Sequence, residues 1–303
     1  MSILSDLSNE ISSAASVAAS TVVTVLGRPR IPSSGIVWKP GLVVTSDAGL
    51  RREEEIKVIL PDGATVPATL KGRDGSTDLA VLACDTGSIA AATFSESPAK
   101  LGELVLTVGR TMDTGPIVTL GVVSGTSAEW RTWRGAKLDE FVRLDVELYP
   151  TSVGGAVVDS KGAVLGIVAG GLSRSSVLVI TRRTIDRVAE ALSSRGRIAR
   201  GYIGIGVQTV AIPAAVKQQL NLEQDTGIMT LSVEENGPAA RAGIMMGDVI
   251  VTLGSHAMSS PEALHAILDP SSVGKQLNAS VLRGGSLQQL TVTVGERPVK
   301  NAA

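Results

Sequence analysis

The sequence predicts a mainly β protein that ends in a smaller α+β unit. The chain has 303 residues, of which 44% are hydrophobic and 19% charged, enough for a buried core and two domains. Only three Trp, two Tyr and two Phe accompany 33 Gly, so we expect an aliphatic core and many tight turns. Short β-branched runs recur about every ten residues, a spacing typical of sandwiches and barrels.

The first part of the chain is expected to be almost all β. Residues 3–19 should form a short amphipathic helix or a frayed arm. Strands are expected at 35–38, 42–45, 56–60, 79–82, 104–108, 118–123, 157–158 and 164–168. A helix over 184–193 would place Ile185, Val188 and Leu192 on one face.

A polar connector at 196–200 precedes a second unit with mixed patterns. Strands are expected at 203–207, 228–233, 249–253, 277–282 and 290–294, and helices at 213–220 and 260–268. Ser260 is the expected N-cap of the last helix, with Pro261 at its first position. The chain therefore divides into an arm with the first strand (1–33), a first domain (34–199), a second domain (200–296) and a tail (297–303).

Charge and composition exclude several function classes. The net charge of −1 lacks the basic excess of a nucleic-acid or anionic-membrane binder. A single cysteine, Cys84, allows no internal disulfide and no multi-cysteine zinc site. Two histidines, His256 and His265, cannot form a metal site alone, and no cofactor is expected.

The N-terminal segment predicts where the protein resides. No apolar run reaches the roughly 18 residues that span a bilayer, so no transmembrane segment is expected. Asp6 and Glu10 precede the first basic residue, Arg28, which is the reverse of the charge order in a secretory signal. As written, the sequence predicts a cytoplasmic protein, or a periplasmic or extracellular one if a leader was removed.

Four segments carry a resemblance in the second domain. Residues 200–205 (RGYIGI) form a glycine-containing turn before a strand, and 237–243 (GPAARAG), 247–251 (GDVIV) and 281–285 (VLRGG) follow in order. Together they resemble the PDZ domain of HtrA-family proteases over nearly all of 200–296. Backbone N–H groups in such a turn can receive a terminal carboxylate, and an exposed strand edge can add a peptide strand.

The resemblance implies that this domain binds peptide or protein C-termini. The expected peptide-binding residues are Tyr202, Ile203, Gly204, Ile205, Leu264, His265 and Leu268. The alternative is plain core packing for Leu264 and Leu268, and simple exposure on the helix surface for His265.

The first domain resembles the protease domain of the same family. The segments that carry this are 34–38 with 42–45, 74–83 (DGSTDLAVLA) and 150–158 (PTSVGGAVV). The resemblance implies a chymotrypsin-like double β-barrel, followed by the PDZ domain. It also implies a homo-oligomer, a trimer in active members, although 1–37 lack the aromatic residues that family trimer contacts often use.

The catalytic positions of the family are changed in this sequence. The family motif Thr-Asn-x-His reads Thr45-Ser-Asp-Ala48 here, and Val153 stands at the serine position, while Asp78 matches the aspartate. Thr151 replaces an oxyanion-loop glycine. Because a serine nucleophile needs a positioned general base, we predict a catalytically degenerate pseudoprotease that is not an enzyme.

Other residues offer alternatives. Ser152 is a substitute nucleophile with Lys39 or Lys161 as its base, Cys84 is a second, and Asp47 is a candidate partner for Asp78. Trp130 and Trp133 are either buried anchors or an exposed partner contact. The main prediction is a non-catalytic adaptor, scaffold or chaperone-like protein that binds peptides. An endopeptidase with unorthodox residues and a purely structural subunit remain open.

Overall fold

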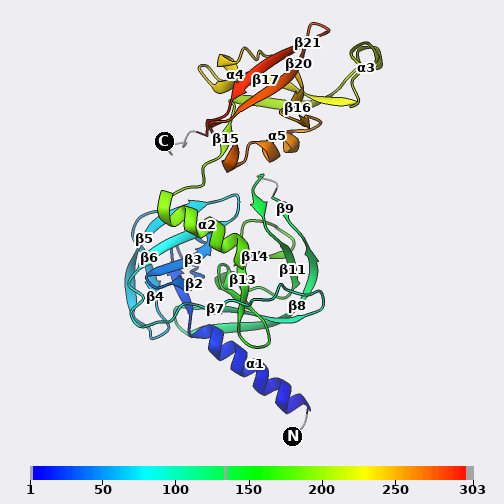
Figure 1. Ribbon diagram of the computed structural model, residues 1–303. Coiled ribbons are helices and arrows are strands. Elements are labelled where there is room, and N and C mark those ends of the chain that lie inside the picture. The colour runs from blue at the N-terminus through cyan, green and yellow to red at the C-terminus, as the bar shows by residue number, and fades with distance from the viewer. Residues whose placement is uncertain (1–2, 133–134, 298–303) are drawn as a thin grey trace. The chain divides into compact units, whose positions relative to one another are not determined.

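The structure is a computed structural model that describes residues 3–132 and 135–297. The chain divides into two compact units, Met1–Ile198 and Ala199–Ala303 (Figure 1).

The first six strands close into a β-barrel. They are β1 (Val22–Leu26), β2 (Ser33–Lys39), β3 (Leu42–Ser46), β4 (Ile56–Ile59), β5 (Thr65–Asp74) and β6 (Leu79–Cys84). The order around the barrel is β1-β2-β3-β6-β5-β4, with every pairing antiparallel. A 3-10 turn, Asp47–Gly49, follows β3. Closure leaves no free sheet edge in this barrel.

Six later strands close a second barrel in the same unit. They are β7 (Leu104–Arg110), β8 (Pro116–Ser127), β11 (Phe141–Asp145), β12 (Ala156–Val158), β13 (Val164–Ala169) and β14 (Val177–Thr181), in the order β11-β14-β13-β12-β7-β8. A small ribbon of β9 (Trp130–Arg131) and β10 (Lys137–Leu138) lies between β8 and β11 in sequence. A second 3-10 turn, Pro150–Ser152, precedes β12.

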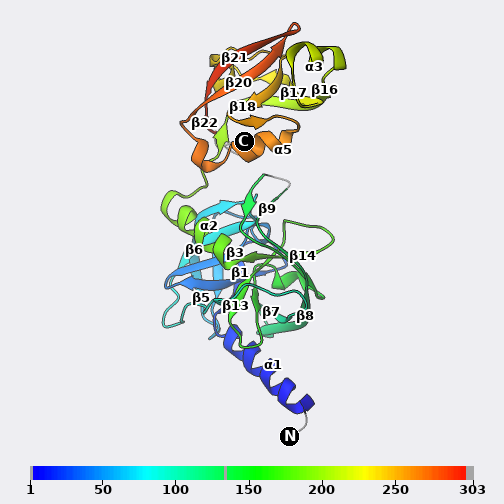
Figure 2. The ribbon, with the colours of Figure 1, turned by 45° about the vertical axis from the view of Figure 1, so that its right-hand side comes forward.

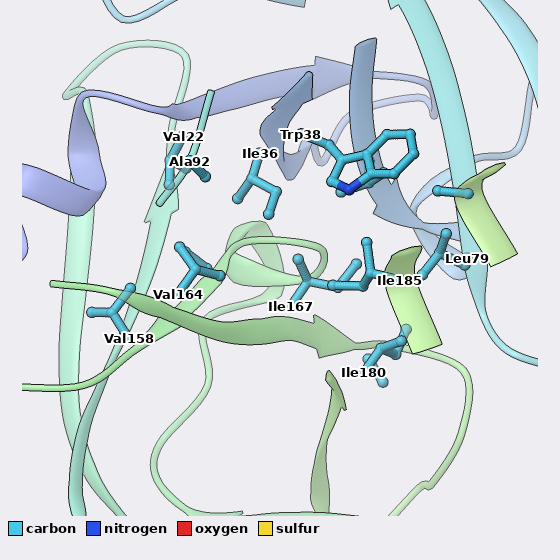
Figure 3. Close-up of a cluster of buried hydrophobic side chains, with 14 of the residues drawn as sticks. Val22, Ile36, Trp38, Leu79, Ala92, Val158, Val164, Ile167, Ile180 and Ile185 are labelled. Carbon is cyan, nitrogen blue, oxygen red and sulfur yellow. The ribbon is translucent and has the colours of Figure 1, made fainter. Parts of the chain in front are cut away.

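Two helices flank the barrels in sequence. In α1 (Ile3–Ala19) only Ala14 and Ala18 are fully buried. In α2 (Arg182–Arg195) the predicted apolar face is confirmed, because Ile185, Val188 and Leu192 are buried. Figure 3 shows Ile185 in one cluster with residues of both barrels, including Ile36 and Trp38 from β2 and Ile167 and Ile180 from β13 and β14. This shared core holds the two barrels together.

The second unit is an antiparallel sheet with short helices (Figure 2). Its strands are β16 (Ile205–Ala211), β17 (Thr226–Val233), β18 (Val249–Leu253), β20 (Gln276–Arg283) and β21 (Ser286–Thr293), in that order. β19 (His256–Ala257) pairs with β18, and β15 (Gly201–Tyr202) pairs with β22 (Gly295–Glu296). The helices are α3 (Ala214–Leu220), α4 (Pro238–Arg241) and α5 (Pro261–Ile267). Strand β16 is therefore an edge strand.

The mainly β prediction is confirmed, with local differences. The predicted strand at 203 begins only at Ile205, because Gly204 adopts φ +78° in the turn before it. Strand β5 was not predicted, because its side chains are mostly half-exposed and give no apolar run. Trp130 is half-buried with its ring edge-on to Phe141 at 5.2 Å, and Trp133 lies outside the described residues.

Candidate functional site

Ala48, Asp78 and Val153 come together between the two barrels. Ala48 lies in the turn after β3, and its backbone N–H donates to Asp78 Oδ1 at 2.9 Å. Val153 follows the 3-10 turn before β12. A side-chain carbon placed on Gly170 would lie 2.5 Å from Val153 Cγ1 and 3.3 Å from the Ala48 Cβ. The fold thus brings these three positions together, although the first and the last are more than 100 residues apart in the sequence.

The Asp78 carboxylate is buried and accepts four hydrogen bonds. The residue is 1% exposed. From the first barrel it receives Ser46 Oγ at 2.8 Å as well as the N–H of Ala48. From the segment after β13 it receives the N–H groups of Gly170 at 2.7 Å and Gly171 at 2.9 Å. One carboxylate therefore ties the two barrels together.

Burial dominates the titration of Asp78. Loss of hydration raises the pKa of this carboxyl above its ordinary value, and the four hydrogen bonds oppose that rise because they favour the ionised form. The residue also has φ +59°, outside the usual range for a residue other than glycine. A buried, strained and polar residue of this kind marks a candidate functional site.

The loop before Val153 is fixed by backbone hydrogen bonds. Ser34 N–H donates to Val153 O at 2.9 Å, and Ser34 Oγ donates to Thr151 O at 2.6 Å. The N–H of Ser152 donates to Tyr149 O at 2.8 Å, closing the 3-10 turn. At Gly154, φ is +80° and a Cβ would meet Ser34 O at 2.4 Å, so the turn requires glycine.

Ser152 and the two lysines considered as its base have contacts of their own. Ser152 is 1% exposed and packs against Gly109. Lys39 pairs with Glu190 at 2.7 Å and lies over the Trp38 ring, and Lys161 is exposed on the turn after β12. The hydroxyl that the structure places on Asp78 is that of Ser46, which the sequence analysis did not single out.

Cys84 and Asp47 also have other partners. Burial, with the charge of Asp85, raises the pKa of the Cys84 thiol, which disfavours the reactive thiolate. Asp47 Oδ1 accepts from Arg73 Nε at 2.5 Å, so its carboxylate is turned to a cation on β5 and does not pair with that of Asp78. Among residues 3–132 and 135–297, no group of three or more His, Cys, Asp or Glu side chains is arranged to hold a metal ion.

The second candidate site is the edge of β16. Within the described residues this strand pairs with β17 alone, from Ile205–Val233 to Ala211–Thr226. Before it, Gly204 turns the chain, with Gly204 O accepting from Glu234 N at 2.8 Å and Ile203 O accepting from Ala239 N at 2.8 Å. Helix α5 contacts this strand, so that an edge with free hydrogen-bonding groups faces a helix.

The predicted peptide-binding residues differ in exposure. Ile203 and Leu264 are 1% and 3% exposed and belong to the core of this unit, whereas Leu268 packs at the margin of that core. Tyr202 is half-buried, and its hydroxyl donates to the Glu234 carboxylate, which lies close to Gly204. Glu234 is not among the residues predicted from the sequence, because it follows β17 and comes near the turn only in the folded sheet.

His265 lies at the surface of α5 among charges. Partial loss of hydration lowers the pKa of its imidazole, the positive charges of Arg297 and Arg200 lower it further, and Glu262 raises it. The two arginines give this end of the domain a positive potential suited to a carboxylate.

Comparisons with known proteins extend over both units. Residues 33–167 match the trypsin-like peptidase domain and residues 201–294 match the PDZ domain. A protein of Halomonas elongata, named probable periplasmic serine endoprotease DegP-like, is 30% identical over 89% of this chain and 57% of its own length. A protein of the same name from Brucella suis is 29% identical over 89% of this chain and 54% of its own length. The chain thus spans little more than half the length of these relatives.

Solved structures of similar proteins cover nearly the whole chain. The serine endoprotease of Yersinia pestis is 27% identical, with a TM-score of 0.76, covering 95% of this chain and 98% of that one. The HtrA-type protease AlgW with a decapeptide is also 27% identical with a TM-score of 0.76, covering 95% of this chain and 99% of that one. Within the described residues, no helix is long and apolar enough to span a membrane.

These findings correct one prediction and leave another unsupported. The prediction that the chain is not an enzyme is contradicted, because the relatives are named serine endoproteases and so point to a protease. The prediction relied on the changed residues Ala48 and Val153 and weighed Ser152, Cys84 and Asp47 as substitutes, but not Ser46, whose hydroxyl the fold places on Asp78. The cytoplasmic prediction is not supported, since the relatives are named periplasmic. The chain thus has a trypsin-like peptidase domain with two six-stranded barrels, followed by a PDZ domain, and is similar in this arrangement to HtrA-type proteases.

Proposed function

We propose that the PDZ domain of this chain binds peptides that end in a free carboxylate after an apolar side chain. The observation that carries the proposal is the edge of β16, which follows the Gly204 turn and faces α5. A peptide that lies along this edge adds a strand to the sheet, and its carboxylate meets the N–H groups of Ile203–Ile205. The solved structure of the HtrA-type protease AlgW with a decapeptide supports the proposal by similarity.

The side chains around the groove set the ligand class. Leu268, at the margin of the core, would bound a pocket for the last side chain of the peptide, and Leu264 would support it from beneath. The nearby charges of Arg200 and Arg297 favour an anionic chain end. One short strand and one anchor give a modest affinity, about micromolar or −8 kcal/mol, because peptide ordering offsets part of the gain.

A titration of the full chain tests this function. Fluorescently labelled peptides with apolar C-termini are titrated by polarisation, with amidated copies as matched controls. Amidation removes the charge-assisted hydrogen bonds and is expected to weaken binding at least about tenfold. Leu268→Asp should weaken it similarly, whereas Asp78→Asn in the first domain should not. Equal affinity for free and amidated peptides would contradict the proposal.

Hydrolysis of peptide bonds is the second candidate function, and the names of the relatives favour it. In this chain the candidate pair is the Ser46 hydroxyl and the Asp78 carboxylate, 2.8 Å apart. Ser46 is 0% exposed, so the segments around it would have to open before the pair could meet a substrate. A carboxylate whose pKa is raised by burial is a better general base than an ordinary one. Casein turnover that is lost in Ser46→Ala but kept in Ser152→Ala would support this pair, and absence of turnover in the unmodified chain would exclude it.

Location and assembly complete the proposal. The relatives' names support a periplasmic location, which cell fractionation tests. Self-association into a homo-oligomer is proposed from the resemblance to HtrA proteases. Light scattering coupled to size exclusion decides it, since a monomer mass of 31.1 kDa at all concentrations would contradict self-association.

A further inference from the structure

A cavity of about 180 Å³ opens at the second barrel. Its apolar lining includes Val142, Leu165 and Val179, from three neighbouring strands of that barrel. The volume exceeds the roughly 150 Å³ of a cavity known to hold benzene, so a small organic molecule fits. None of the lining residues belongs to the Asp78 cluster or to the second unit.

Thr181, which also lines this cavity, carries an unsatisfied hydroxyl. It is the N-cap of α2 and is 4% exposed. Its Oγ1 makes no cap hydrogen bond and, among the described residues, has no hydrogen-bond partner. A threonine at this position ordinarily accepts from an N–H of the first turn, and those N–H groups have no intrahelical partner. A buried polar group left this way costs free energy unless a ligand satisfies it.

Two arginines lie at the N-terminus of α2, where a positive charge is ordinarily unfavourable. Arg182 and Arg183 open α2, at the positive end of its dipole, and both line the cavity. Their contacts are long. Arg182 Nε lies 3.4 Å from Asp186 Oδ2, its Nη1 lies 3.5 Å from Ser95 O, and its guanidinium carbon lies 5.7 Å from the centre of the Phe94 ring. Arg183 Nη1 lies 3.8 Å from Glu140 Oε1. Both guanidinium groups can therefore turn to an anionic group in the cavity, and the helix N-terminus adds to its attraction.

The charged residues that line the cavity indicate a ligand that carries a positive group as well as a negative one. Glu96 and Glu140 line the same cavity and balance the two arginines, so a ligand without net charge suits it best. We propose that this cavity binds a free apolar α-amino acid of about the size of leucine. Its carboxylate meets the arginine pair and, after rotation of the buried Thr181 side chain toward the cavity, the hydroxyl of Thr181. Its ammonium group meets Glu140, and its side chain lies on the apolar lining.

Calorimetric titration of the full chain with L-leucine tests the site. The matched probes are L-leucinamide, which lacks the carboxylate, and 4-methylpentanoate, which lacks the ammonium group. Each probe is expected to bind at least about tenfold more weakly than leucine, because each loses a charge-assisted interaction. Thr181→Val and the double variant Arg182→Gln, Arg183→Gln should weaken leucine binding about fivefold or more. Arg195→Gln, at the other end of α2, is the control and should leave it unchanged.

Three results would overturn this inference: no saturation by leucine at millimolar concentration, equal binding of either probe, or leucine binding unchanged in both variants. Circular dichroism establishes that each variant is folded, and the double variant alters only exposed side chains. The test uses no peptide and no protease substrate, so it stands apart from the proposed function.

Discussion

At the scale of single residues, the charge on Glu234 opposes the proposed peptide site. Its carboxylate is held by the Tyr202 hydroxyl and lies close to Gly204, where the peptide carboxylate is expected. Repulsion between the Glu234 carboxylate and the peptide carboxylate weakens binding. It therefore selects against peptides whose last side chain contributes little to the affinity.

Glu234→Gln is therefore expected to tighten peptide binding. The amide oxygen can still accept from Tyr202, so the change removes charge and keeps the contact. We expect a gain of about threefold in affinity, corresponding to about 0.6 kcal/mol. Polarisation titrations at low and high salt measure it, with Glu235→Gln, one residue further along, as the control. A gain of the same size in the control would contradict a local effect.

The lowered pKa of His265 predicts how acid affects the second unit. The unfolded chain binds a proton near the ordinary pKa of histidine, whereas the folded domain holds the imidazole neutral to lower pH. The contribution to stability is present above the ordinary pKa and is lost as the pH falls through the folded value. Thermal unfolding of this unit between pH 7 and pH 5 should show a smaller decrease in His265→Gln than in the unmodified chain. An identical decrease would contradict this assignment.

At the scale of elements, the 3-10 turn before β12 depends on Gly154. The residue combines φ +80° with a backbone approach that leaves no room for a Cβ beside Ser34 O. Gly63 also has a positive φ, +90°, but no atom lies within 4 Å of its Cβ position. The two positions therefore separate backbone strain from steric clash.

Gly154→Ala is expected to lower the free energy of unfolding of the first unit by about 3 kcal/mol, since overpacking adds to backbone strain. Gly63→Ala should cost only about 1 kcal/mol, from strain alone. Urea denaturation of both variants measures the difference. Equal losses would show that the turn before β12 relaxes around the added methyl group.

At the scale of the whole first unit, Asp78 links the two barrels through polar contacts. Ser46 and Ala48 lie on the side of the first barrel and Gly170 and Gly171 on that of the second. Asp78→Ala removes the acceptor shared by four donors, of which the N–H of Gly170 keeps only a longer contact with Ser46 Oγ at 3.3 Å. It is expected to lower the free energy of unfolding by about 3 kcal/mol or more. Asp62→Ala, which removes one exposed acceptor for Ala64 N–H, is the control and should cost less than about 1 kcal/mol. Equal effects in urea denaturation would contradict the role of the buried link.

The sequence alone determined the β-rich fold, the face of α2 and the two resemblances. These depend on local alternation, on helical spacing and on motifs that are contiguous in the chain, such as residues 200–205. A helix face of Ile185, Val188 and Leu192 is fixed by the 3.6-residue period before any tertiary contact forms. The sequence did not determine whether the chain is active. The identities of Ala48, Asp78 and Val153 do not reveal which other groups the fold places around them.

Only the tertiary structure decided which groups surround Asp78, Glu234 and Thr181. Ser46 and Gly170 meet on Asp78 because the packing of the two barrels brings β3 next to the segment after β13, 124 residues later in the chain. Glu234 reaches Gly204 through the pairing of β16 with β17, and Thr181 loses its solvent where α2 begins against the second barrel. Each of these is a long-range contact, and its existence depends on packing that no local pattern encodes.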